Sequence, residues 1–268
     1  MNMIINKETI SQLASQGKRL DGRGLLDYRD PIKVDLNISW TAEGSAKVQI
    51  GNTVVMAGVK MAIEKPYNDT PDEGGISVNA ELLPLSSPEY EPGPPGIKAV
   101  ELARVTDRGI RESKAIDVKK LCITPGEKAW FVTIDLITIN DSGNLFDACA
   151  LAALAALKSA QFPKVDPATG AIDYHTKTGE KLPLLKEPVV VTVYKINGSF
   201  MVDPNHEEEG AYDARLSVAS DERGIISALQ KGGAEPLSLE EISQMVDIAL
   251  DKAKFLRKVL NSELNMRD

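Results

Sequence analysis

Residues 128–160 read KAWFVTIDLITINDSGNLFDACALAALAALKSA and contain three segments of different character. Residues 128–140 are rich in β-branched and aromatic side chains, which is typical of a strand. Residues 141–144 follow as a turn whose residue types commonly cap helices. Residues 146–160 are mainly alanine and leucine, with Asp147 in the first turn, where a helix dipole favours an anion. The stretch predicts a strand, a turn and a helix whose small side chains permit close packing.

The sequence on the N-terminal side of this stretch predicts mainly strands. Residues 45–50 and 53–63 flank the pair Gly51-Asn52, which accepts positive φ and is typical of a hairpin turn. Alternating apolar and polar residues predict further strands over 31–40 and 76–82, and helical spacing predicts helices over 7–16 and 97–117. Five prolines within 84–96 indicate a long surface loop.

The sequence on the C-terminal side repeats the order of strands followed by a helix. Strands are predicted over 188–195, 199–202, 214–219 and 224–229. A final amphipathic helix is predicted over 238–260, where Ser238 and Glu241 have the spacing of a capping box. We therefore expect an N-terminal half over residues 1–165, a polar linker or excursion over 166–187, and a C-terminal half over 188–268. The fold class is α/β (α+β), with mixed sheets rather than a doubly wound parallel sheet, because hairpins make several neighbours antiparallel.

Composition excludes several classes of protein. The 268 residues are 43% hydrophobic and 26% charged, which excludes a disordered, collagen-like or coiled-coil chain. The formal net charge is −8, so any contact with a polyanion requires a local basic patch. Cys122 and Cys149 have no metal-binding spacing and indicate neither disulfides nor a zinc ribbon, which favours a cytoplasmic protein. The first eight residues lack the pattern of a secretory signal, and no stretch predicts a membrane span.

The sequence carries no common phosphate-loop, dinucleotide-binding or zinc-protease motif, and its only histidines are His175 and His206. The acidic run 203–209 is either a divalent-cation site or a solvated turn, and we favour the turn because consecutive glutamates point in different directions. Residues 141–144 either bind phosphate or simply cap the helix, and we favour the cap because no lysine or arginine adjoins them. We expect neither a metal nor a cofactor.

Arg104, Arg108 and Arg111 are spaced by four and three residues, so they share one face of the predicted helix. They either contact RNA phosphates or form salt bridges within the helix. The pairs for the second alternative are Glu101 with Arg104, Asp107 with Arg111, and Glu112 with Arg108. Spacing alone leaves both alternatives open.

Several ordered motifs together resemble one known family. They are Arg19-Leu20-Asp21-Gly22-Arg23, residues 44–53, residues 101–113 (ELARVTDRGIRES), residues 141–148 (DSGNLFDA), and Val202-Asp203-Pro204 with Glu207-Glu208-Glu209. The chain resembles the RNase PH-like phosphorolytic exoribonucleases, and most closely the non-catalytic RNase PH-type subunit of the archaeal exosome. The resemblance implies an RNase PH fold of two halves, each resembling the second domain of ribosomal protein S5.

The resemblance also implies partners. Such subunits alternate with a catalytic RNase PH-like subunit in a hexameric ring of three heterodimers. RNA-binding cap proteins top the ring, which degrades single-stranded RNA from its 3′ end with phosphate.

The catalytic pattern of the family is degenerate in this sequence. Active members hold phosphate with a Gly-Ser-Arg turn, and the aligned residues here are Ser142, Gly143 and Asn144. The two catalytic aspartates align with Glu209 and Arg215, so one carboxylate is lengthened and the other is reversed in charge. The resemblance thus implies a non-catalytic subunit with no catalytic residues. The alternatives are a nuclease active on its own through Glu209 and Asp213, and a scaffold without an RNA role.

Overall fold

The computed structural model describes residues 7–166 and 168–265. Residues 1–6, on which the expectation of no secretory signal partly rests, lie outside the described residues, as do the outermost parts of the two expected halves. Within the described ranges, none of the helices combines the length and apolarity needed to cross a membrane.

The first half is built on a six-stranded mixed sheet in the order β1-β2-β3-β6-β4, with β5 beside β6. Its strands are β1 (Ile32–Leu36), β2 (Gly44–Ile50), β3 (Thr53–Glu64), β4 (Gly75–Glu81), β5 (Cys122–Thr124) and β6 (Lys128–Asn140). The hairpin around Gly51-Asn52 is confirmed, since β2 and β3 pair antiparallel from Ile50↔Thr53 outward. The strand predicted over 31–40 is shorter, because Asn37 takes φ 55° and leaves the extended conformation after Leu36.

The second half carries a four-stranded antiparallel sheet in the order β10-β9-β11-β12. Its strands are β9 (Val189–Ile196), β10 (Ser199–Val202), β11 (Ala214–Ser220) and β12 (Ile226–Gly233). Asn197 and Gly198 both have positive φ, as a two-residue hairpin turn between β9 and β10 requires. Among the described strands, the only parallel pairing is therefore that of β4 with β6 in the first sheet.

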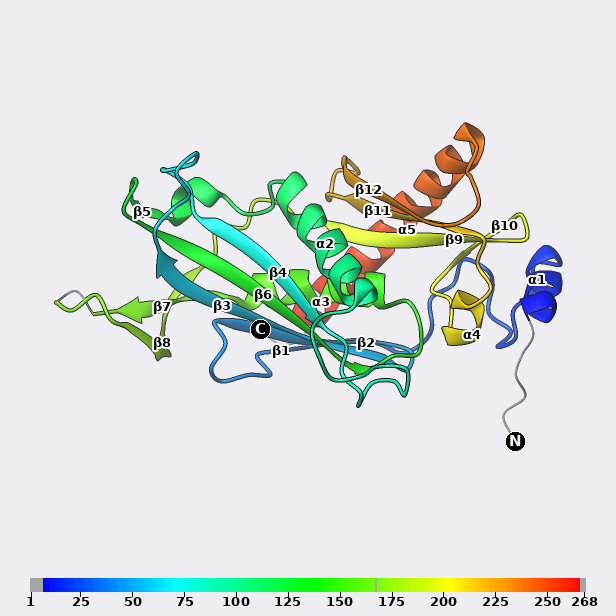
Figure 1. Cartoon of the computed structure of the whole chain (residues 1–268), viewed down its shortest axis with the longest axis horizontal. Helices are drawn as coiled ribbons and strands as arrows, with labels where there is room; N and C mark the ends of the chain where they lie inside the picture. The colour runs from blue at the N-terminus through cyan, green and yellow to red at the C-terminus, as the bar shows by residue number, and fades with distance from the viewer. Residues whose placement is uncertain (1–6, 167, 266–268) are drawn as a thin grey trace.

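Helices connect and cover the two sheets (Figure 1). They are α1 (Lys7–Ser15), α2 (Ile97–Glu112), the 3-10 turn η1 (Val118–Leu121), α3 (Leu145–Ser159), α4 (His206–Glu209) and α5 (Leu239–Asn265). The helix predicted over 97–117 ends earlier, because Ser113 donates its hydroxyl to Ile110 O and Lys114 takes φ 55°. The capping box of α5 is confirmed by the reciprocal bonds between Ser238 and Glu241.

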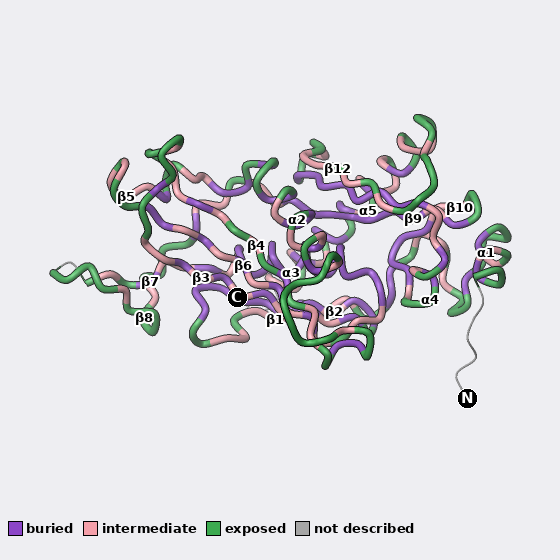
Figure 2. The backbone as a smooth tube through the Cα atoms, in the orientation of Figure 1, coloured by how far each residue is buried: buried purple, intermediate pink, exposed green. Residues whose placement is uncertain are grey.

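The helix α3 is the centre of the core. Every residue from Leu145 to Leu157 is buried, and α3 packs against β2 and β3 of one sheet and β9 of the other (Figure 2). Its predicted close packing is confirmed at Gly44, where a Cβ would lie 2.7 Å from the Cα of Ala160. One apolar cluster thus runs through both halves.

The polar stretch 166–187 contains most of a projecting hairpin. The strands β7 (Gln161–Val165) and β8 (Ile172–Lys181) pair antiparallel and extend away from the two sheets (Figure 1). Eight of the ten residues of β8 are exposed. The stretch leaves and rejoins the core, since Leu184 bridges back to Ile116.

Candidate functional site

The acidic run 203–209 is not the solvated turn that we expected. Asp203 and Glu208 are only 0% and 1% exposed, and residues 206–209 form the short helix α4. Asn205 caps α4 in a capping box, in which its side chain accepts from Glu208 N at 2.8 Å and Glu208 accepts from Asn205 N at 2.9 Å. Buried carboxylates need charged partners, and the chain supplies them from a distant segment.

Arginines from residues 19–29 neutralise these carboxylates. Arg29 donates to both carboxylate oxygens of Asp203, from Nε at 2.9 Å and from Nη2 at 2.8 Å. Arg23 lies 3.2 Å from the same carboxylate, and Arg19 donates from Nε to Glu208 at 3.0 Å. The N-terminal segment is thereby fastened to the C-terminal half. The described residues contain no group of three or more metal-ligating side chains placed to hold an ion.

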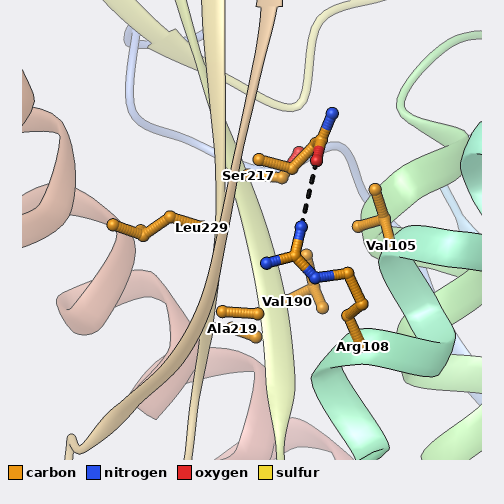
Figure 3. A pocket seen from close by; sticks show the side chains of 8 residues that line it. Val105, Arg108, Val190, Ser217, Ala219 and Leu229 are labelled. Atoms are coloured by element: carbon orange, nitrogen blue, oxygen red, sulfur yellow. Dashed lines mark hydrogen bonds between the residues drawn. The ribbon is translucent and has the colours of Figure 1, made fainter. Parts of the chain in front are cut away.

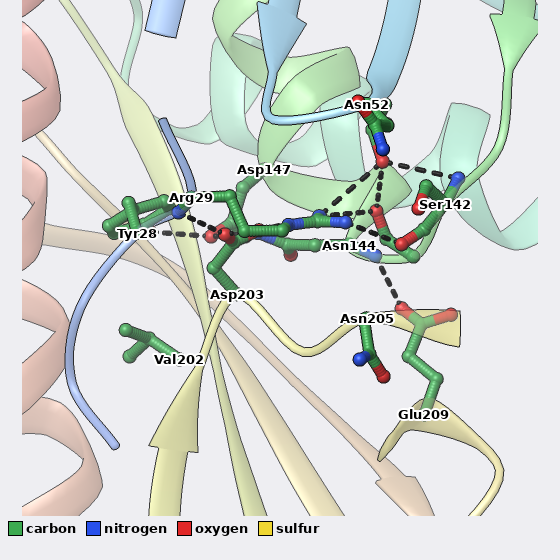
Figure 4. Close-up of polar contacts among 12 residues, drawn as sticks. Tyr28, Arg29, Asn52, Ser142, Asn144, Asp147, Val202, Asp203, Asn205 and Glu209 are labelled. Atoms are coloured by element: carbon green, nitrogen blue, oxygen red, sulfur yellow. Dashed lines mark hydrogen bonds and ion pairs between the residues drawn. The ribbon is translucent and has the colours of Figure 1, made fainter. Parts of the chain in front are cut away.

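Asn144 occupies the N-cap position of α3 but does not cap it with its side chain. We expected a simple cap; instead, Nδ2 of Asn144 donates to Asp203 at 2.9 Å and to Asp147 at 3.2 Å (Figure 4). A cap would need the oxygen of this amide as an acceptor, but Oδ1 is buried without a hydrogen-bond partner among the described residues, and the left-handed backbone of Asn144, at φ 59°, departs from the extended conformation of a usual N-cap. The turn also needs Gly143, which has φ 94° and whose Cβ would lie 2.5 Å from Pro204 O. Residues 141–144 therefore pack directly against the segment before α4.

Asp147 lies in the first turn of α3, as expected, and its fully buried carboxylate also accepts hydrogen bonds from other elements. Tyr28 donates its hydroxyl to Asp147 at 2.6 Å, and Thr192 donates its backbone N–H at 2.8 Å. Burial raises the pKa of Asp147 to about 7, although these hydrogen bonds oppose the shift. The residue thus links the N-terminal segment, α3 and β9.

Glu209 lies at the N-terminus of α3. Its Oε1 accepts from the backbone N–H of Asn144 at 2.7 Å (Figure 4). The same oxygen accepts from the hydroxyl of Tyr194 at 3.0 Å. Burial raises the pKa of Glu209, while the positive charge of Lys98 and the Asn144 N–H oppose the shift. The carboxylate therefore takes the place where a helix N-terminus would hold a bound anion.

Arg215 is held by neighbours that occupy most of its guanidinium. Nη2 donates to Glu101 at 2.6 Å, and the guanidinium carbon lies 4.2 Å from the centre of the Phe146 ring. The side chain is only 6% exposed, and Nη1 is buried without a hydrogen-bond partner among the described residues. Glu101 therefore pairs with Arg215 and not with Arg104, the partner that the salt-bridge alternative assigned to it.

Glu209 and Arg215 line one cleft of about 320 Å³. Its charged members are Lys98, Arg215, Glu89, Glu101 and Glu209, and its other members include Leu145, Phe146, Tyr194, His206 and Tyr212. The structure thus brings Glu209 and Arg215 together, beside the helix end that Asn144 begins. No pattern in the sequence indicated that Lys98, Glu101 and Tyr194 line this cleft, because they come from the distant elements α2 and β9.

Asp213 does not join Glu209 in this cleft. Its carboxylate accepts from the backbone N–H of Asn197 at 2.7 Å and lies 3.6 Å from Lys7. It is also absent from the residues that line the cleft. The pair of Glu209 and Asp213, on which an independent nuclease would depend, therefore does not converge.

The three arginines of α2 are all exposed but differ in their contacts. Arg104 has no ion pair or hydrogen bond from its side chain to any described residue, and Arg108 reaches only Gln230, at 3.3 Å (Figure 3). Arg111 forms a bidentate pair with Asp107, at 3.1 and 2.7 Å, and donates to Ile76 O. Of the three intrahelical pairs considered, only Asp107 with Arg111 therefore forms within the described chain.

Comparisons with known proteins agree with this architecture. The model of the 3′ exoribonuclease family, domain 1, matches residues 29–163, and the model of domain 2 matches residues 186–252. The exosome complex component Rrp42 of Methanosarcina acetivorans is 47% identical over 255 residues, covering 94% of this chain and 92% of that protein. The corresponding protein of Thermococcus onnurineus is 45% identical over 261 residues, covering 96% and 95%.

A solved structure is also closely similar. A chain of the Archaeoglobus fulgidus exosome with RNA bound to the active site matches with a TM-score of 0.84 and 41% identity, covering 94% of this chain and 96% of that one. The two family models together span most of the chain and flank the projecting hairpin. The RNase PH-like resemblance of the motifs is thus confirmed, and the chain belongs to the 3′ exoribonuclease family.

Proposed function

We propose that the chain is a non-catalytic RNase PH-like subunit of an archaeal exosome. In this role it structures the active site of a sister catalytic subunit and contributes RNA contacts to 3′-to-5′ phosphorolytic degradation. The observation that carries the proposal is the position of Glu209, whose carboxylate accepts the N–H at the start of α3. The names of the relatives, which are exosome components, support the assembly.

Phosphorolysis requires a site that attracts phosphate close to a group that assists the leaving oxygen. The helix end that would attract phosphate already holds a carboxylate, and the residue before the helix is a neutral asparagine turned toward Asp203. The arginine that lines the cleft, Arg215, is paired with Glu101. Asn144, Glu209 and Arg215 therefore act as degenerate catalytic positions, and the chemistry falls to the sister subunit.

The RNA contacts of this subunit are assigned to Arg104, Arg108 and Arg111. Their common exposed face supports this assignment, as does the failure of two of the three intrahelical pairs to form. With a net charge of −8, the molecule needs such a local concentration of cations to approach a polyanion. Arg104 and Arg108 are free to bind phosphates, whereas Arg111 must share its guanidinium with Asp107.

The remaining parts of the proposal concern assembly and location. The subunit alternates with the catalytic subunit in a hexameric ring of three heterodimers, carries RNA-binding cap proteins, and works in the cytoplasm. The division into residues 1–165, 166–187 and 188–268 is supported by the two family models, which end at 163 and resume at 186.

One experiment separates this proposal from its two alternatives. Purified chain, sister subunit and co-expressed complex are each incubated with single-stranded RNA, magnesium and phosphate, and nucleoside diphosphates are measured. We expect no release by the chain alone, and more release by the complex than by the sister subunit alone. Release by the chain alone, after removal of contaminating nucleases, would show an independent nuclease. A complex no more active than the sister subunit, and with no greater affinity for RNA, would favour the scaffold.

A further inference from the structure

A separate cavity of about 680 Å³ lies at the C-terminal end of α2, and we call it the α2 pocket. Arg111, the last of the three exposed arginines of α2, is one of the residues that line it. Arg111 follows Arg104 by seven residues, which is about 10 Å along the helix axis. A strand of RNA that lies along Arg104 and Arg108 and continues toward Arg111 therefore reaches the pocket.

The charges that line the α2 pocket sum to zero, so the pocket does not suit a phosphate. The described lining carries three cations and three carboxylates, which are Arg111, Lys114, Lys119, Asp69, Glu73 and Asp117. Its walls also include apolar side chains, among them Ile76, Ile116 and Leu185. A neutral pocket with apolar walls and polar groups at fixed positions suits an uncharged, flat and partly polar group such as a nucleobase.

Tyr67 supplies an aromatic ring to this pocket. The residue is 62% exposed, although its ring packs edge-to-face on Phe131, with ring centroids 5.5 Å apart and an angle of 74° between the planes. The contact orients the ring and leaves much of its surface in water. Exposed aromatic rings beside cations are the platforms on which bases of single-stranded nucleic acids stack.

The segment that carries Tyr67 is held in place by neighbouring elements. Gly74 donates its N–H to Val118 O of η1 at 2.8 Å, and Gly126 donates to Pro71 O at 2.7 Å. Gly75 packs so closely on β6 that a Cβ there would overlap the ring of Phe131. The pocket is therefore formed before a ligand binds, which reduces the entropy lost on binding.

We propose that the α2 pocket binds a base of single-stranded RNA and that the ring of Tyr67 is the surface on which this base stacks. The inference rests on the proposed function, because the arginines of α2 bring the strand to the pocket. It adds a contact of a different chemical kind. Stacking uses the face of the base, so it tolerates any sequence and, unlike a phosphate contact, releases no counterions.

The test measures the affinity of the assembled complex for a labelled single-stranded oligonucleotide by fluorescence anisotropy over a range of salt concentrations. Tyr67→Ala removes the ring and should weaken binding at least about fivefold. The slope of log affinity against log salt concentration should not change, because no phosphate contact is lost. Tyr67→Phe keeps the ring and should keep the affinity. The matched control is Tyr174→Ala, which removes an exposed aromatic ring of β8 outside the pocket and should have no effect.

An oligonucleotide of abasic nucleotides separates stacking from other roles of Tyr67. This probe keeps the phosphates and lacks the bases, so Tyr67→Ala should not weaken its binding. Thermal melts and size-exclusion chromatography establish that each variant is folded and assembled. If Tyr67→Ala does not fold, Tyr67→Leu gives the same readout, because it keeps an apolar side chain without an aromatic ring.

The proposal is overturned if the folded and assembled variant without the ring binds the intact oligonucleotide as tightly as the original complex does. An equal loss of affinity for the abasic probe, or an equal loss caused by Tyr174→Ala, would overturn it too. So would a folded variant that no longer assembles, because the pocket would then be an interface with another subunit. The proposed RNA contacts fail on a different result, namely unchanged RNA binding after replacement of Arg104 and Arg108.

Discussion

Replacing Arg104 and Arg108 together with alanine should weaken binding of single-stranded RNA by the assembled complex. Both side chains are exposed on α2, and neither forms an ion pair within the described chain. Their removal therefore leaves no buried charge behind and should cost less than about 1 kcal/mol of folding stability. RNA affinity should fall for all single-stranded sequences alike, because phosphate contacts do not depend on the base.

The size of the effect follows from counterion release. Each phosphate contact on a single strand contributes about 0.7 to the slope of log affinity against log salt concentration. Loss of two contacts should therefore lower the magnitude of this slope by about 1.4. Arg111→Ala alone should lower it less than either single change at the other two positions, because Arg111 gives up its Asp107 partner in order to bind a phosphate.

Fluorescence anisotropy with a labelled oligonucleotide, measured from about 50 to 200 mM salt, gives the slope directly. The matched control is Lys254→Ala with Lys258→Ala, which removes two exposed cations at the same spacing from α5. The control should change neither slope nor affinity. If the arginine variant keeps both the slope and the affinity of the original complex, the arginines form only a solvated surface and the RNA assignment is wrong.

Three further predictions concern the core and the network in Figure 4. Asp203→Ala should lower the free energy of unfolding by roughly 3–5 kcal/mol in urea titrations, because it leaves Arg29 buried without its carboxylate; a loss below about 1 kcal/mol would contradict this role. Asp147 has its pKa raised to about 7, so its contribution to stability is complete below about pH 3.9 and decreases as pH rises toward 7. The stability of Asp147→Asn should therefore rise relative to that of the original chain as pH increases from about 3.9 to 7. If the urea midpoints of the two proteins differ by the same amount at every pH in this range, the raised pKa of Asp147 is refuted. Gly44→Ala should destabilise by about 1–3 kcal/mol in thermal melts, since its Cβ would meet the backbone of α3, whereas Gly58→Ala, with open space, should cost less.

Local features of the fold were predictable because their causes lie close together in the sequence. The hairpin at Gly51-Asn52 depends on two turn residues with β-branched neighbours, and the start of α5 depends on Ser238 and Glu241. The strands follow from the alternation of their side chains, and the alanine-rich helix follows from its content of strong helix formers. Two predicted elements were too long, and a residue with positive φ lies just beyond the true end of each. Lys114 follows the end of α2, and Asn37 follows the end of β1. Such endings are poorly marked in a polar sequence.

The site was only partly predictable. The common exposed face of Arg104, Arg108 and Arg111 follows from helical spacing, whereas the proposal that Asn144 and Glu209 are degenerate catalytic positions rests on the family resemblance. The partners of these residues do not. The spacing of Glu101 and Arg104, three residues apart, suits an ion pair within the helix. Glu101 instead pairs with Arg215, which is more than a hundred residues away in the sequence.

The sequence by itself determined most of the strands and helices, the fold class and the family, because periodicity, turn chemistry and ordered motifs are properties of neighbouring residues. Only the tertiary structure decided that Asp203 and Glu208 of the acidic run are buried against arginines from residues 19–29, and that Glu209 reaches the N-terminus of α3. The physical reason is that a buried charge takes whichever partner the packing of distant elements brings within hydrogen-bond distance. Spacing along the chain carries no record of that choice.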